Sequence, residues 1–243
     1  MRELAEYLGR LVGSVDVPAY FRLLASHIDV AALPKRMKLE FGVDDPSDEI
    51  VRQLIQPLSG TGQVPTRSWE LCNSLAVLVI DYSINGNDPY KLAYAGVLYL
   101  WFSADEEIDE WPLTESRALV LVIHCLDKLD ADVRLETMRV LCSLMPKIAD
   151  REEGDPFSAA AWVVAAVNLS AQWYTAAGRS GLAAIRDLAV RIQPQVEEYG
   201  AEGYEENFYN SLRKLKRVEK ELEPWGQKIA EELMQVLSTK HLW

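Results

Sequence analysis

The chain has 243 residues, of which 49% are hydrophobic and 26% are charged, and its formal net charge is −12. This composition excludes a chain that is disordered throughout, because it supplies enough apolar surface to form a core. The negative charge disfavours nucleic acids and anionic lipid surfaces as partners and favours basic proteins. Three scattered cysteines are too few for a disulfide framework, which is typical of a reducing compartment. The N-terminal segment lacks the apolar run of a secretory signal, so we expect a soluble, cytoplasmic protein.

Apolar residues recur at helical spacing along most of the chain, which predicts amphipathic helices. The first stripe lies at residues 4–11, and the next contains Tyr20, Phe21 and Leu24. Further stripes follow at residues 50–58, 135–145 and 182–196. In the stripe at 135–145, we expect Leu135 to face inward and Thr137 to face outward. Four tryptophans within apolar stretches are expected in the core, namely Trp69, Trp101, Trp162 and Trp173.

Capping residues agree with these stripes, because a good N-cap or an Asp-Pro pair precedes several of them. The predicted helix starts are Asp16, the Asp-Pro pairs at 45–46, 88–89 and 155–156, Thr114, and Asp130. Glycines and the Asn85-Gly86-Asn87 turn supply the predicted stops. We expect about ten helices joined by short loops.

Two short apolar runs, Leu75–Ile80 and Ala118–Ile123, also have the composition of buried strands in a parallel sheet. Each run lies inside a longer helical pattern, at 66–84 and 114–129, with no turn residues before it. We therefore predict an all-α fold, either an irregular multi-helix bundle or a short α-solenoid, with an α/β fold as the alternative.

The last part of the chain differs from the rest. A basic cluster, Arg213–Lys220, shares a predicted helix with apolar residues, and Pro224 interrupts the pattern. We expect a helical body over 1–200 and a C-terminal helical hairpin over 201–243 packed on it, together forming one domain. Acidic residues surround the basic cluster, so a solvated helix face is favoured over contact with nucleic acid. Residues 157–177 are uncharged but only weakly hydrophobic, which favours a buried helix over a membrane span.

An acidic run followed by an aromatic residue is the most distinctive local feature. It consists of Asp105, Glu106, Glu107, Asp109, Glu110 and Trp111. An exposed aromatic side chain is a typical interface anchor, and neighbouring carboxylates suit a basic protein surface. We therefore predict that these residues bind a protein partner.

Clustered carboxylates also suggest an enzymatic alternative, because helical nucleotide pyrophosphatases hold Mg²⁺ in this way. The ligands would be Glu107 and Glu110 together with Asp127 and Asp130. The second pair matches the required spacing only loosely, since Asp127 stands where a glutamate belongs. Trp111-Pro112 also follows the first pair at once, which favours a solvated loop over a metal site.

No other motif indicates chemistry. The sequence lacks a GxSxG nucleophile, a phosphate-binding loop with its lysine, and an HExxH zinc motif. His124 and Cys125 are adjacent, and neighbouring helical residues point in different directions, so we do not expect them to share a metal. We expect no catalytic residues, no cofactor and no bound metal.

The sequence therefore favours a non-enzymatic protein that binds a basic protein partner, without nucleic acid or membrane contact. A bacterial immunity protein that neutralises a basic toxin is one concrete version, in agreement with the size and charge of the chain. A helical repeat adaptor that binds peptides in a groove is a further alternative. The sequence leaves the oligomeric state open.

Overall fold

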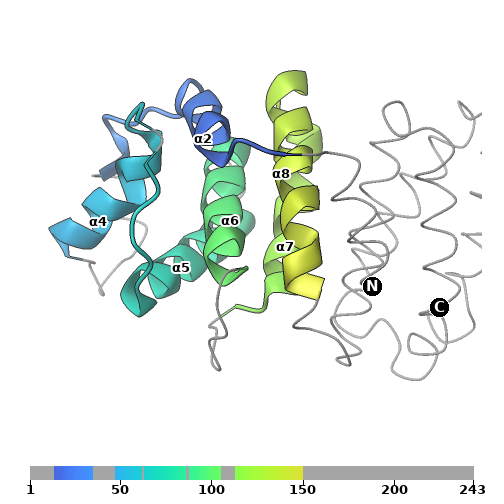
Figure 1. Ribbon diagram of the computed structural model, residues 1–243. Helices are drawn as coiled ribbons and strands as arrows, with labels where there is room; N and C mark the ends of the chain where they lie inside the picture. Colours follow the sequence, from blue (N-terminus) through green and yellow to red (C-terminus); the bar gives the residue numbers. More distant parts are fainter. Residues whose placement is uncertain (1–13, 35–46, 62, 86–87, 105–112, 150–243) are drawn as a thin grey trace, which may run out of the picture. The chain divides into compact units, whose positions relative to one another are not determined.

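The computed structural model describes residues 14–34, 47–61, 63–85, 88–104 and 113–149 (Figure 1). Contacts within the chain define two compact units, one formed by residues 14–144 and the other by the remaining residues. The elements below lie in the first unit, and the last of them continues past its end. The predicted boundary at residue 200 lies outside the described residues.

Every regular element in the described ranges is helical, and none of these ranges contains a strand. In chain order the elements are α2 (Val17–Ala25), α4 (Asp48–Ile55), the short 3-10 helix η1 (Gln56–Leu58), α5 (Trp69–Asn85), α6 (Pro89–Ser103), α7 (Glu115–Cys125), the 3-10 helix η2 (Leu126–Lys128) and α8 (Ala131–Ala149). The predicted all-α fold is confirmed for this part of the chain. The count of about ten helices includes the remaining residues and stays a prediction.

Both apolar runs with strand-like composition are helical, as expected. Leu75–Ile80 lies within α5, and Ala118–Ile123 lies within α7. Most residues of the second run are buried, because α7 packs against α6 and α5 and also contacts η2. A helix that is buried over much of its circumference needs no polar stripe, which explains the uninterrupted apolar composition.

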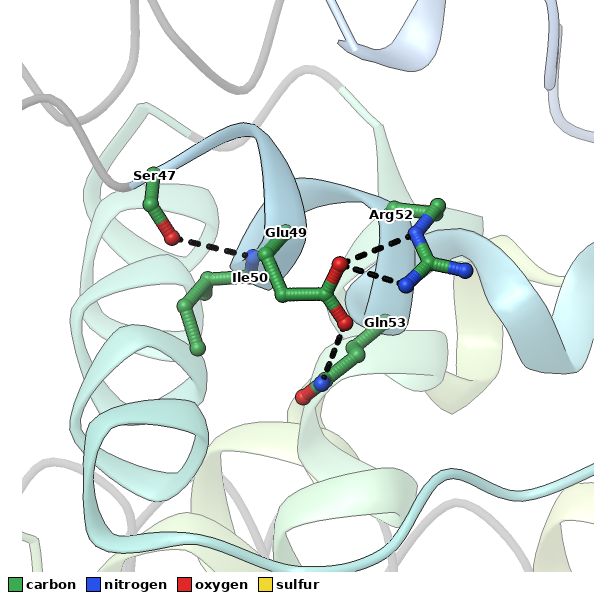
Figure 2. Close-up of polar contacts among 5 residues, drawn as sticks. All are labelled: Ser47, Glu49, Ile50, Arg52 and Gln53. Carbon is green, nitrogen blue, oxygen red and sulfur yellow. Dashed lines mark hydrogen bonds and ion pairs between the residues drawn. The ribbon is translucent and has the colours of Figure 1, made fainter.

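The capping predictions can be checked at five helix starts. Asp16 accepts a hydrogen bond from the Ala19 amide at 3.0 Å, and Asp88 caps α6. Helices α7 and α8 begin directly after Thr114 and Asp130, as predicted. The predicted start at Asp45-Pro46 is wrong, because α4 begins at Asp48 and the Ser47 hydroxyl accepts a hydrogen bond from the Ile50 amide (Figure 2). The pair at 155–156 lies outside the described residues.

Helix α6 is the centre of this unit, and twelve of its 15 residues are buried. It packs against α5 and α7 and also contacts α2 and η2, and it stands in the middle of the described helices in Figure 1. Apart from Lys91 and Ser103, its buried residues are apolar or aromatic, which is typical of a helix that is buried all round.

Helices α6 and α7 approach each other closely at Gly96. A Cβ atom added to this glycine would overlap the Cγ2 methyl group of Val122 on α7. The absence of a side chain at Gly96 therefore permits the backbone of α6 to lie directly against a side chain of α7. The distance between the two helices depends on this glycine.

Two buried tyrosines of α6 bind the backbone of other segments. The Tyr94 hydroxyl donates a hydrogen bond to the carbonyl oxygen of Leu54 in α4. The Tyr99 hydroxyl donates to the carbonyl oxygen of Leu113, just before α7. Because an unsatisfied buried hydroxyl is costly, these bonds favour one position of each segment relative to α6.

A third buried tyrosine connects α2 to α8. The Thr137 hydroxyl donates its hydrogen to the carbonyl oxygen of Val133 at 2.7 Å, so the Tyr20 hydroxyl is the donor in the 3.2 Å bond to Thr137. Two sequence expectations about α8 are therefore wrong, because Thr137 is buried while the Leu135 side chain is 44% exposed. A threonine whose hydroxyl has two hydrogen-bond partners can be buried at little cost.

The contact at Gly96 leads to a first prediction, for the Gly96→Ala variant. Alanine is the better helix former, yet its methyl group would overlap Val122, and overpacking of a core typically costs about 1–3 kcal/mol. We expect urea denaturation to show a lower free energy of unfolding by this amount. Adding Val122→Ala should recover part of the loss, so the double variant should be more stable than the sum of the single effects implies. A Gly96→Ala variant more stable than the original chain would contradict the close packing.

The buried tyrosines lead to a second prediction, about alkaline pH. Burial raises the pKa of Tyr20, Tyr94 and Tyr99 far above the ordinary value of 10.0. Unfolded tyrosines ionise near pH 10 while the folded ones stay protonated, so stability is fully present below pH 10 and falls as the pH rises above it. Each group contributes a slope of about 1.4 kcal/mol per pH unit.

Urea denaturation between pH 8 and about pH 11 measures this slope. Burial also raises the pKa of the Cys72 thiol from 9.0 to about 11, so a Cys72→Ala background removes its contribution. In that background, Tyr94→Phe should make the decline shallower by the contribution of one group. A free energy of unfolding that does not change above pH 10 would show that these tyrosines titrate normally.

Candidate functional site

The predicted partner-binding residues lie outside the part of the chain that the structure describes. They are Asp105, Glu106, Glu107, Asp109, Glu110 and Trp111. Their role in binding stays a prediction.

Of the carboxylates in the enzymatic alternative, only Asp127 and Asp130 lie in described ranges, and both are exposed. An Asp130 oxygen lies 3.6 Å from Nδ1 of His27, whose ring stacks on that of Tyr90 with 4.7 Å between ring centroids. Desolvation and then the hydrogen bond with Asp130 raise the pKa of Tyr90. Asp130 therefore connects the end of α2 and the start of α6 to the start of α8. No three His, Cys, Asp or Glu side chains within the described ranges are grouped to hold a metal ion, and Glu107 and Glu110 lie outside them.

Helix α5 carries a row of exposed apolar side chains, which we call the outer face of α5. Its members, with their exposed fractions, are Trp69 (60%), Val77 (45%), Ile80 (39%) and Ile84 (76%). Val77, Ile80 and Ile84 follow one another at intervals of three and four residues, so they share one side of the helix. Trp69 was expected in the core, and this expectation is wrong. The buried side of α5 is instead formed by residues that include Leu71, Leu75 and Leu78.

The charges on α5 are all negative. Glu70 and Asp81 are its two acidic residues, and the helix contains no lysine, arginine or histidine. Glu70 is exposed and Asp81 is half-buried, with one Asp81 oxygen accepting a hydrogen bond from Asn85 at 2.6 Å. At 100° per residue, both carboxylates lie next to the outer face of α5. The helix therefore presents an apolar surface with an acidic edge.

A cavity of about 330 Å³ lies where the end of α5, the start of α6 and the end of α7 come together. We call it the inter-helix pocket, and it is lined by Tyr82, Ser83, Asp88, Pro89, Leu92, Leu121, His124, Cys125 and Lys128. His124 and Cys125 both line it, although as sequence neighbours they were expected to point apart. The pocket lies between helix ends that are distant in sequence, so no local motif indicates it.

A larger hollow, of about 530 Å³, lies beside α4. Its lining includes Val51, Arg52 and Ile55. Arg52 and Gln53 donate hydrogen bonds to the Glu49 carboxylate, as Figure 2 shows, and the bonds from Arg52 lower the pKa of Glu49 most. The Arg52 guanidinium is thus already paired, and the other lining residues divide between the apolar Pro34, Val51 and Ile55 and the polar Asp48, Gln56 and Ser59.

Comparison with known proteins found no match to this chain among family models, curated proteins or solved structures. In the described ranges, none of the helices combines the length and apolar character needed to span a bilayer. Inference about function therefore depends on the surfaces and cavities of the chain itself.

Proposed function

We propose that the chain is a non-enzymatic binding protein whose outer face of α5 contacts a basic protein partner. The observation that supports this proposal is the exposure of Trp69, Val77, Ile80 and Ile84 along one helix. Single exposed apolar residues are common on protein surfaces, whereas Val77, Ile80 and Ile84 are neighbours on one side of α5, and such a group of large apolar side chains marks an interaction site.

The residue types on this face suit an interface. Tryptophan is enriched among the residues whose truncation costs the most binding energy, and Trp69 is 60% exposed. Ile84 is exposed even further, at 76%, and its burial by a partner would remove a complete apolar side chain from water. A partner with a complementary apolar surface would gain most of its affinity at these two positions.

The charge of the chain favours a basic partner. Glu70 and Asp81 lie along the outer face, and the whole chain carries a net charge of −12. Complementary charges at the edge of an interface increase the association rate and select against partners of the same sign. A basic toxin neutralised by this chain would be one such partner. The acidic run at 105–110 and Trp111 combine the same two properties, and we propose that they bind the same class of partner.

A third prediction tests this surface with two variants of the full chain, Ile84→Asp and Trp69→Ala. The control is Leu135→Asp, which introduces the same charge as Ile84→Asp but on α8. Leu135 is an apolar residue that is 44% exposed, close to the 45% of Val77 on the outer face of α5. Affinity capture from cells of the native host, with mass spectrometry, identifies candidate partners, and titration of the purified partner then measures affinity. We expect a basic partner whose affinity falls by about 30-fold or more in both variants and is unchanged in Leu135→Asp.

Thermal unfolding of all variants separates loss of binding from loss of folding, because substitutions at exposed positions should change stability by no more than about 0.5 kcal/mol. A partner that binds Ile84→Asp as tightly as the original chain would contradict the proposal, as would a partner that is acidic. Self-association of the original chain that Ile84→Asp abolishes would assign the face to a second copy and contradict the proposal as well.

A further inference from the structure

The inter-helix pocket has a buried floor and a polar rim. Tyr82, Leu92 and Cys125 are buried and form its floor, whereas Lys128 is exposed. The Cys125 thiol donates a hydrogen bond to the carbonyl oxygen of Pro89 at 3.5 Å, so the floor presents mainly carbon and sulfur. A volume of about 330 Å³ lies within the range of small-molecule sites.

The rim carries the carboxylate of Asp88 and the nitrogen-bearing side chains of His124 and Lys128. One Asp88 oxygen already accepts hydrogen bonds from the amides of Tyr90 and Lys91, both at 3.2 Å, and so caps α6. His124 lines the pocket with an imidazole that can donate a hydrogen bond in either protonation state. No described residue forms an ion pair or hydrogen bond with the Lys128 ammonium.

A second lysine, Lys91, lies next to the Tyr82 ring. Lys91 is 6% exposed, and its ammonium nitrogen lies 5.3 Å from the centroid of the Tyr82 ring. A buried ammonium near an apolar cavity is screened less by solvent than a surface charge. The pocket therefore combines an apolar interior with a rim that carries the Lys128 ammonium and the Asp88 carboxylate.

We propose that the inter-helix pocket binds a small carboxylic acid with a short apolar body. The apolar part would contact Tyr82, Leu92 and Leu121, and the carboxylate would lie at the rim between Lys128 and His124. Lys128 favours an anionic over a cationic ligand, and one oxygen of Asp88 is engaged by the cap of α6. This site is independent of the outer face of α5.

The fourth prediction tests the site by titrating the full chain with hexanoate in a calorimeter, with hexanamide as the uncharged control probe. We expect saturable binding of hexanoate and binding of hexanamide that is weaker by about tenfold or more, because the amide lacks the charge. Lys128→Met, which keeps the apolar part of the side chain, should weaken hexanoate binding by a similar factor. Leu121→Phe should also weaken it, because the larger ring fills the pocket.

Arg117→Met is the matched control, since Arg117 is an exposed cation on α7 that does not line the pocket. It should bind hexanoate like the original chain, and thermal unfolding should show that all variants are folded. The proposal is wrong if hexanoate does not bind or if hexanamide binds equally well. It is also wrong if Lys128→Met binds hexanoate as tightly as Arg117→Met and the original chain do.

Discussion

The close packing of α6 against α7 at Gly96 is the constraint on which the rest of this unit depends. Because a side chain at Gly96 would overlap Val122, the two helices can lie this close only with glycine at that position. Twelve of the 15 residues of α6 are buried, and the hydroxyls of Tyr94 and Tyr99 bind the carbonyl oxygens of Leu54 and Leu113. The central helix thus positions α4 and the start of α7 by directional bonds as well as by apolar contact.

The two functional proposals follow from this arrangement. With α6 already surrounded, α5 buries one side against it and leaves Trp69, Val77, Ile80 and Ile84 exposed on the other. The start of α6 meets the ends of α5 and α7, and the polar residues at these ends surround a cavity with an apolar floor. An interaction surface and a small-molecule pocket can therefore belong to the same helical unit without sharing residues.

Much of the local structure could be predicted from the sequence, because caps and apolar periodicity are local signals. Asp16, Asp88 and Thr114 precede helices as expected, and the two apolar runs with strand-like composition are helical. Burial was harder to predict, since an apolar run such as Leu75–Ile80 does not indicate which of its sides faces the core. The exposure of Trp69 could not be predicted for this reason. The burial of Thr137 could not be predicted either, because Tyr20, its hydrogen-bond partner, is more than one hundred residues away.

The candidate sites were less predictable than the helices. The inter-helix pocket brings together residues from three helix ends, and such a combination depends on tertiary packing that no local spacing encodes. His124 and Cys125 are an example. Adjacent residues of a helix point in different directions, yet both of these side chains line the same cavity. The acidic run at 105–110, which the sequence singles out, lies outside the described residues, so its role stays a prediction.

Native-state hydrogen exchange on the full chain tests the central position of α6 most directly. If α6 is the core of the unit, the amides of Leu92–Phe102 should exchange most slowly, with an opening free energy equal to that of global unfolding. The amides of α2 and α4 should exchange through smaller openings, because these helices are short and contact α6 less extensively than α5 and α7 do. Exchange of the α6 amides at a free energy well below that of global unfolding, or faster than in α4, would contradict this organisation.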